Sequence, residues 1–357
     1  MSSENDQLVW KAYAVKDTKK WSEFEIINFE PKTFDDYDID IKINYCGVCG
    51  SDVHTITGGW GGNTILPLIT GHEIIGTVHR VGPKVTEFHV GDRVGVGAQI
   101  WSCLECESCK ADKEQYCAKA VDTYNDKYPN GDIAHGGYST AIRAHERFTF
   151  PIPKELDSKM AAPLMCAGIT VYSPLKANNV GKGKVVGIVG IGGLGHLAIQ
   201  FAKAMGAKVI VFSHSPSKEK DARELGADEF VVTSDASFAN QWERKIDVLL
   251  STADVSSGFP LGDFFKVLAA EGTFVVVGIP DDKLPQFAAP GLVLKGAKLA
   301  GSKIGSKKGI IEMLELAAKH DVKAWIEELP MKECGTAVKD VKEGHVRYRH
   351  ILKMDLE

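Results

Sequence analysis

The chain has 357 residues, 44% of them hydrophobic and 25% charged, with a net charge of −5 at pH 7. This length predicts two domains, and the slightly acidic balance gives no electrostatic reason to expect nucleic acid or an anionic membrane as a partner. The first sixteen residues, MSSENDQLVWKAYAVK, lack the apolar core of a signal peptide, and no window approaches eighteen uncharged apolar residues. We therefore expect a cytoplasmic protein without a membrane span, in a compartment where disulfides are rare.

The first part of the chain, up to about Phe150, carries short β-like runs that are punctuated by glycine and aspartate. These runs are DIDIKINYC (38–46), GTVHRVG (76–82) and PKVTEFHVGDRVGVG (83–97). Short strands with this punctuation predict an irregular β barrel or sandwich.

After about residue 156, strands alternate with helices. The expected strands are KVVGIVG (184–190), KVIVFS (208–213), EFVVT (229–233), IDVLLST (246–252) and TFVVVG (273–278). The first two expected helices are LGHLAIQFAKAMG (194–206) and PSKEKDARELG (216–226). Such alternation predicts a doubly wound parallel sheet.

The tail from about Gly305 holds a helical stretch (307–320), a strand (324–330) and a closing segment (340–353) whose ending is strand-like. We expect this tail to rejoin the first domain, because its last strand has no place in a nucleotide-binding sheet that is already complete. The expected domains are therefore 1–155 together with 305–357, and 156–304.

Half of the eight cysteines lie within fifteen residues, CLECESCKADKEQYC. They are Cys103, Cys106, Cys109 and Cys117, in the spacing C-x2-C-x2-C-x7-C. Two-residue gaps let thiolates turn onto one centre, and four sulfurs are typical of a closed structural zinc site, which stabilises a loop and performs no chemistry. An iron–sulfur cluster and four unliganded thiols are the alternatives.

A second group of potential ligands is scattered along the chain. Cys46 and Cys49 lie in CGVCGSDVH, His72 and Glu73 in TGHEIIG, and Cys166 in LMCAGIT. Two cysteines and one histidine would meet the need of a catalytic zinc, which takes three protein ligands and keeps one position open. The spacing alone leaves open that the cysteines are small core residues and the histidine is structural.

The stretch VVGIVGIGGLGHLAIQFAKAMGA places four glycines directly after a strand and at the start of a helix: Gly190, Gly192, Gly193 and Gly195. In this context glycine allows a tight turn and lets a pyrophosphate approach bare backbone at the helix N-terminus. The pattern predicts dinucleotide binding; the alternative is a tight turn without a ligand.

The end of the next strand indicates which dinucleotide binds. NAD enzymes usually carry an acid there for the ribose 2′-hydroxyl, whereas this chain has Ser213, His214, Ser215 and Lys218 in VFSHSPSK. Hydroxyls and an ammonium group suit a 2′-phosphate, so we favour NADP(H) over NAD. The alternative for Lys218 is a solvated helix residue.

These constellations, in this order, resemble the zinc-containing medium-chain alcohol dehydrogenases, and most closely the NADP(H)-dependent cinnamyl alcohol dehydrogenase branch in its fungal form. The matching stretches are CGVCGSDVH, GHEIIGTVHRVG, VGDRVGVGAQIWSCLECESC, GDIAHGGYS, AAPLMCAGITVYSPL, VGIVGIGGLGHLAIQFAKAMGA and the ending EGHVRYRHIL. The resemblance implies an α/β protein with a GroES-like β-rich catalytic domain and a Rossmann domain of doubly wound parallel sheet, which together enclose a cleft.

The resemblance also implies the metal chemistry. A catalytic zinc would be held by Cys49, His72 and Cys166, while Cys46 would be structural and Glu73 an alternative ligand during exchange. With the four-cysteine zinc, two zinc ions per chain are expected. Glu73 could instead be a buried acid that is paired elsewhere.

Further roles follow from the same resemblance. Ser51 would bond the substrate oxygen, and His54 would continue a proton relay to solvent. The plant members carry an aspartate shortly after this histidine, but HTITGGWGG has no acid, so the relay would end at His54 or at the cofactor ribose. Thr170 would pack beside the nicotinamide, and His214 stands where close relatives have arginine, which leaves the strength of 2′-phosphate binding open.

The side chains proposed for the substrate pocket are Trp60, Trp101, Tyr124 and Ile304, for each of which ordinary core packing is the alternative. The expected activity is NADP(H)-dependent interconversion of primary alcohols and aldehydes, working in cells as an aldehyde reductase, with a homodimer implied by the family. The alternatives are an NAD-dependent polyol or secondary alcohol dehydrogenase and a non-catalytic zinc-folded nucleotide-binding protein.

Overall fold

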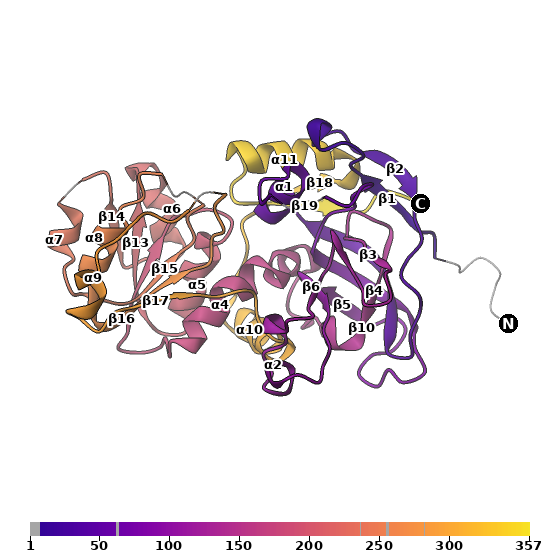
Figure 1. The fold of residues 1–357 in the computed structure, drawn as a ribbon, viewed down its shortest axis with the longest axis horizontal. Coiled ribbons are helices and arrows are strands. Elements are labelled where there is room, and N and C mark those ends of the chain that lie inside the picture. Colours follow the sequence, from indigo (N-terminus) through magenta and orange to yellow (C-terminus); the bar gives the residue numbers. More distant parts are fainter. Residues whose placement is uncertain (1–7, 62–63, 236, 255–256, 282) are drawn as a thin grey trace. The chain divides into compact units, whose positions relative to one another are not determined.

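A computed structural model describes residues 8–61, 64–235, 237–254, 257–281 and 283–357. The chain divides into two compact units (Figure 1). The first unit comprises Met1–Cys166, Gly305–Ala318 and Ala324–Glu357, and the second comprises Ala167–Ile304 and Lys319–Lys323. This division falls after Cys166, later than the boundary that we expected at residue 155, because the helices α3 (Ser158–Ala161) and η4 (Ala162–Met165) pack against strands of the first unit.

The first unit is β-rich. Its strands are β1 (Lys11–Ala14), β2 (Glu25–Asn28), β3 (Asp38–Gly47), β4 (Glu73–Val81), β5 (Arg93–Val96), β6 (Gln99–Trp101), β7 (Val121–Asp122), β8 (Asp126–Lys127), β9 (Ile133–Ala134), β10 (Ala141–His145), β11 (Thr149–Pro151), β18 (Ile326–Pro330) and β19 (Arg349–Lys353). Its remaining helices are η1 (Thr18–Lys20), α1 (Gly50–Thr57), α2 (Glu107–Lys110), η2 (Glu114–Tyr116), η3 (Glu146–Phe148), α10 (Lys307–His320, which ends in the second unit), η6 (Met331–Glu333) and α11 (Cys334–Glu343).

A seven-stranded sheet organises the first unit, in the order β11-β5-β4-β3-β19-β18, with β10 also paired to β3. The late strand β19 runs antiparallel to β3, with Ile351 opposite Gly47, so segments from both ends of the chain share one sheet (Figure 1). The alternating apolar residues of β3, including Ile39, Ile41 and Ile43, are buried and contribute to one core with α1 and α11.

The second unit holds α4 (Ala167–Ala177), β12 (Val185–Val189), α5 (Gly195–Ala204), β13 (Lys208–Ser213), η5 (Pro216–Lys218), α6 (Glu219–Glu224), β14 (Glu229–Val232), α7 (Phe238–Gln241), β15 (Ile246–Ser251), α8 (Leu261–Val267), β16 (Leu268–Val276), α9 (Pro290–Val293) and β17 (Lys298–Gly301). All the pairings in its six-stranded sheet, β14-β13-β12-β15-β16-β17, are parallel, which confirms the predicted doubly wound sheet.

The strand order of this sheet reverses between β12 and β15, and ligands of such sheets bind at the carboxyl ends of the strands at that point. Helices α4 and α5 pack on one another and on β15 and β12, whereas α8 packs on β16. Because helices cover such sheets on both faces, β12 reads as a continuous apolar run rather than an alternating one.

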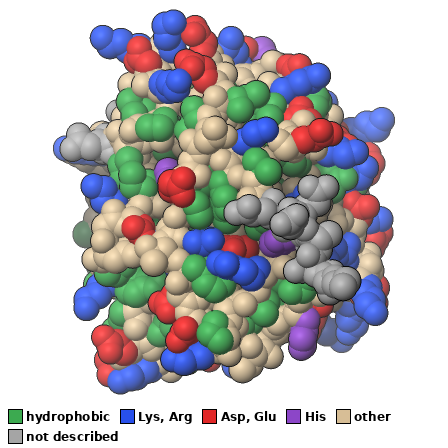
Figure 2. All heavy atoms as spheres, turned by 90° about the vertical axis from the view of Figure 1, so that its right-hand side faces the viewer, with side chains coloured by type: hydrophobic (Ala, Val, Ile, Leu, Met, Phe, Trp, Pro, Cys, Tyr) green, Lys and Arg blue, Asp and Glu red, His purple; other side chains and the backbone are tan. Residues whose placement is uncertain are grey.

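The surface shown in Figure 2 carries lysine, arginine and acidic side chains interspersed with apolar ones, which fits the small net charge of −5. Among the residues that the structure describes, no helix combines the length and the apolarity that crossing a bilayer requires.

Candidate active site and metal centres

Two clusters of potential metal ligands occur among the described residues, and the first contains Cys49, His72, Glu73 and Cys166. One ligand atom from each lies within 4.8 Å of all the others, and all four residues are buried. Cys49 precedes α1, which follows β3, and Glu73 begins the neighbouring strand β4. The register sets Gly47 opposite Glu73, and a Cβ at Gly47 would lie 2.1 Å from Glu73 Oε2, so a larger residue at position 47 would displace the Glu73 carboxylate.

The donor atoms of this first cluster fit a zinc ion. Nε2 of His72 is buried without a hydrogen-bond partner, which is costly in a protein interior unless a ligand occupies it. A hydrogen bond from Cys166 holds the pKa of Cys49 well below its ordinary value and raises the pKa of Cys166. Burial lowers the pKa of His72, but the neighbouring Cys49 and Asp52 outweigh it and raise this pKa to about 9. These surroundings favour the thiolate form of Cys49 where a cation would bind.

Asp52 lies behind this cluster, and our sequence analysis did not single it out. Its fully buried carboxylate accepts the backbone N–H of Cys49 at 2.8 Å, the N–H of Gly71 at 3.0 Å and the hydroxyl of Tyr138 at 3.3 Å. Its Oδ1 lies 3.9 Å from Nδ1 of His72, which is an ion-pair rather than a hydrogen-bond distance. At this distance the carboxylate acts on the imidazole electrostatically and raises the pKa of His72.

Arg349 is the second functional side chain that sequence reasoning missed. It forms a buried ion pair with Glu73, and the two side chains are 6% and 0% exposed. Burial raises the pKa of Glu73 to about 7 although the guanidinium opposes this shift, and Oε2 of Glu73 has no hydrogen-bond partner. One carboxylate oxygen of this paired glutamate lies within 4.8 Å of the other ligand atoms.

The residues predicted for the proton relay lie on α1. Oγ of Ser51 is 3.7 Å from Sγ of Cys49. The ring of His54 stacks on Trp60, with centroids 4.9 Å apart and planes inclined by 9°. Two residues with separate predicted roles, relay and pocket wall, are thereby in direct contact.

The other predicted pocket residues have different surroundings. Tyr124 is buried and stacks on His72 at 5.4 Å, so it supports a potential metal ligand. Trp101 is partly buried and packs against the core of the first unit. Ile304 ends the main segment of the second unit, and its backbone φ is 33°. Thr170, which was predicted to pack beside the nicotinamide, is buried on α4 of the same unit.

The second cluster contains Cys103, Cys106, Cys109 and Cys117, whose sulfur atoms all lie within 4.8 Å of one another. The distance is 3.5 Å in each of the pairs Cys106–Cys109 and Cys103–Cys117, and the cysteines are free thiols. The backbone N–H groups of Glu105 and Cys106 lower the pKa of Cys103 to about 6, as suits a metal-binding thiolate.

Cys46 belongs to neither cluster. It is fully buried, and burial raises its pKa. A small apolar role in the core accounts for it.

The glycine loop follows β12 at the switch point of the second unit. Gly190 has φ +90°, and a Cβ at Gly195 would lie 2.0 Å from the carbonyl oxygen of Gly190, so both positions require glycine. A Cβ at Gly192 would meet no atom within 4 Å, so the loop backbone is open to an approaching group there. Gly193 completes the turn into α5. This geometry fits a dinucleotide pyrophosphate at the helix N-terminus.

The residues predicted to select the dinucleotide follow β13. Ser213 ends that strand, and Ser215 shares a 2.8 Å hydrogen bond with Ser217. Nζ of Lys218 donates to the carbonyl oxygen of Ile191 at 2.7 Å. This contact ties the ammonium group to the glycine loop, so Lys218 is not a fully solvated helix residue. His214 lies between Ser213 and Ser215 in the sequence.

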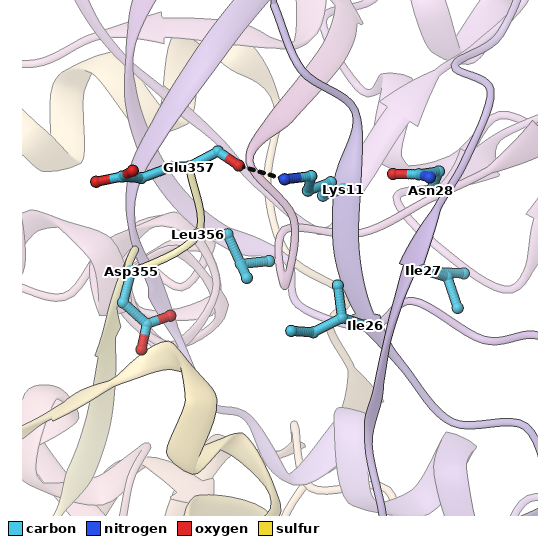
Figure 3. Close-up of a pocket in the computed structure, with 7 residues that line it drawn as sticks. All are labelled: Lys11, Ile26, Ile27, Asn28, Asp355, Leu356 and Glu357. Atoms are coloured by element: carbon cyan, nitrogen blue, oxygen red, sulfur yellow. Dashed lines mark hydrogen bonds between the residues drawn. The ribbon is translucent and has the colours of Figure 1, made fainter.

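A separate groove of about 520 Å³ lies between the β1–β2 hairpin and the C-terminal segment (Figure 3). Its lining residues are Lys11, Ile26, Ile27, Asn28, Asp355, Leu356 and Glu357. Lys11 Nζ donates to the carbonyl oxygen of Glu357 at 2.7 Å. The groove contains no cysteine or histidine, so it does not compete as the metal site.

Comparison with known proteins agrees with this geometry. Residues 35–154 match the alcohol dehydrogenase GroES-like domain, and residues 193–319 match the zinc-binding dehydrogenase family. The chain is 41% identical over 347 residues to an NADP-dependent alcohol dehydrogenase of Saccharomyces cerevisiae, covering 96% of each chain. It is 44% identical over 329 residues to a probable mannitol dehydrogenase of Mesembryanthemum crystallinum, covering 91% of this chain and 90% of that one.

Among solved structures, a cinnamyl alcohol dehydrogenase of Sorghum bicolor matches with a TM-score of 0.92 and 36% identity, covering 98% of this chain and 99% of that chain. The fold and the ligand clusters thus define a zinc-binding dehydrogenase with a GroES-like and a Rossmann domain, as predicted. The chain belongs to the zinc-containing medium-chain alcohol dehydrogenase family, in its cinnamyl alcohol dehydrogenase branch.

Proposed function

We propose that this alcohol dehydrogenase interconverts primary alcohols and aldehydes with NADP(H) and works in cells as an aldehyde reductase. The observation that carries the proposal is the convergence of one histidine nitrogen and two cysteine sulfurs, with Nε2 of His72 buried and unpartnered. Cys49, His72 and Cys166 would hold a catalytic zinc, and the four-cysteine cluster would hold a structural one. The protein would then bind two zinc ions per chain.

When bound, the zinc ion supplies Lewis acidity toward a carbonyl oxygen, and the nicotinamide supplies the hydride. The hydroxyl of Ser51 would bond the substrate oxygen and pass on a proton that His54 takes from solvent. Glu73, held by Arg349, would approach as an alternative ligand while product exchanges. The second cluster would perform no chemistry.

The preference for NADP(H) rests on the residues after β13. No carboxylate stands in the stretch 213–218, where it would repel a 2′-phosphate, and Lys218 is anchored to the loop that would hold the pyrophosphate. The yeast relative named NADP-dependent supports this preference. Lys218→Ala should raise KM for NADPH several-fold and KM for NADH by less, because only NADPH loses the contact with its 2′-phosphate while both lose the anchor of the glycine loop.

The substrate class follows from the branch and from its relatives. The sorghum neighbour is named a cinnamyl alcohol dehydrogenase, which supports cinnamyl aldehydes as substrates. We propose that other aromatic and medium-chain aliphatic aldehydes are substrates as well. Several relatives are named mannitol dehydrogenases, so oxidation of a polyol with NAD is the alternative function.

A substrate panel tests both possibilities. Cinnamaldehyde, benzaldehyde and hexanal are offered with NADPH and, in parallel, with NADH; mannitol is offered with both oxidised cofactors. The proposal requires fast NADPH oxidation with the aldehydes. Rapid mannitol oxidation with NAD and slow aldehyde reduction would support the polyol function.

We also propose a homodimer that forms through the sheet of the second unit. The strand β17 lies at the edge of that sheet, and Val293 and Leu294 nearby are each 75% exposed. An unpaired edge and exposed apolar side chains suit a second copy of the chain. Val293→Asp should yield monomers in light scattering.

The same chain would work in the cytoplasm. Its eight cysteines are all free thiols, as expected in a reducing compartment. Fractionation of cells should therefore recover the protein with cytosolic markers.

A further inference from the structure

The segment after α1 reverses direction and places the side chain of Trp60 against His54 of that helix. Gly58 ends α1 in the left-handed conformation, with φ +71°. The N–H of Gly59 then bonds the carbonyl oxygen of His54 at 2.9 Å, and the N–H of Gly61 bonds that of Gly58 at 3.0 Å. This tight turn reverses the chain, so that the next side chain, Trp60, returns to the ring of His54.

The stack of Trp60 on His54 is close to parallel, at 9° with centroids 4.9 Å apart. Trp60 remains 41% exposed, so burial of apolar area does not fully explain why the chain holds an indole there. Stacking against the imidazole is the interaction that the turn provides.

A relay histidine carries a positive charge for part of each turnover, and that charge needs stabilisation. An indole face is the best aromatic partner for a cation, so a ring stacked on His54 attracts its protonated form. The same contact restricts the rotation of the imidazole.

We propose that Trp60 is a positioning residue for proton transfer: it fixes the imidazole of His54 and stabilises its protonated form. This inference rests on the proposed function, because it assigns a role to Trp60 within the same relay. It replaces the prediction that Trp60 is mainly a wall of the substrate pocket.

Single-turnover oxidation of bound NADPH by cinnamaldehyde tests the inference, because product release does not limit that measurement. Loss of the cation–π contact alone should slow Trp60→Ala about two- to five-fold, with the affinity for the aldehyde unchanged. The solvent deuterium isotope effect should increase, since proton transfer becomes more limiting. Trp60→Phe keeps a ring and should recover most of the rate.

A matched control is available in the same unit. Tyr37 is also 41% exposed and stacks on a histidine, His145, at 5.5 Å and 22°. Tyr37→Ala removes a comparable contact away from the relay and should leave both the rate and the isotope effect at wild-type values.

A double-mutant cycle decides whether Trp60 acts through His54. In a His54→Ala background, Trp60→Ala should cause no further loss of rate. An equal loss in both backgrounds, or a change in aldehyde affinity with a normal isotope effect, would assign Trp60 to the substrate pocket and overturn the inference. A wild-type protein that reduces no aldehyde with either cofactor would remove the proposed function as well, so the two failures are distinct.

Discussion

Zinc uptake at the cluster of Cys49, His72 and Cys166 should release about two protons near pH 7.5. With a pKa of about 9, His72 carries a proton at that pH, and Cys166, whose pKa is raised, carries another. Cys49, whose pKa is lowered, is already a thiolate and contributes none. Because metal binding requires deprotonated ligands, affinity should rise about hundredfold per pH unit here, and about tenfold per unit once His72 is neutral above pH 9.

The assay is calorimetric zinc titration of protein whose four-cysteine cluster is already loaded, in buffers of different ionisation enthalpy. The slope of the measured heat against that enthalpy gives the number of protons released. The number of protons released on zinc binding should fall by one between about pH 7.5 and pH 10. In His72→Asn this decrease should be absent. A release that stays constant over this range in the wild type would refute the charge state that we assign to the cluster.

The other predictions concern the two clusters and the cofactor loop. Cys49→Ser should abolish turnover without unfolding the chain, whereas Cys106→Ser should lower the melting temperature; the reverse pattern in activity and melting assays would mean that the roles are exchanged. Arg349→Met removes the cation that opposes the raised pKa of Glu73, so the buried carboxyl should take up a proton near pH 7 and remain without its hydrogen-bond partner. The cost in denaturant unfolding should be about 1–3 kcal/mol, with partial recovery when Glu73→Gln is added. Gly195→Ala should weaken NADPH binding, measured by fluorescence titration, because its Cβ would overlap a backbone oxygen; wild-type affinity would contradict this packing.

Features encoded by neighbouring residues could be predicted from the sequence. The glycine loop lies between a strand and a helix that are adjacent in sequence, so its local pattern was sufficient. The four-cysteine cluster likewise spans fifteen residues, and its spacing predicted the convergence of its sulfur atoms.

Long-range contacts were harder to predict. Spacing alone could not bring Cys166 to Cys49, and the resemblance to a family was needed. Arg349 was missed because its partner lies 276 positions earlier and meets it only through the pairing of β19 with β3. Asp52 lies within the motif CGVCGSDVH, but the sequence does not show that its carboxylate accepts a hydrogen bond from the N–H of Gly71, in the turn before His72. The contact of Trp60 with His54 depends on the left-handed conformation of Gly58. The sequence shows the glycines of this turn, but it does not show that the turn brings Trp60 back to His54.

The pairing of β3 with β19 also has a consequence for biosynthesis. On the ribosome, β3 emerges early, and its neighbour β19 emerges only after the entire nucleotide-binding sheet has been made. Domains tend to fold as units as they leave the ribosome, so the second unit can mature while the first still lacks a strand. The guanidinium that balances Glu73 arrives with that last strand. The metal pocket therefore acquires its full complement of charges only after the nucleotide-binding sheet has been synthesised, so competence for catalysis depends on a strand that is made later than that sheet.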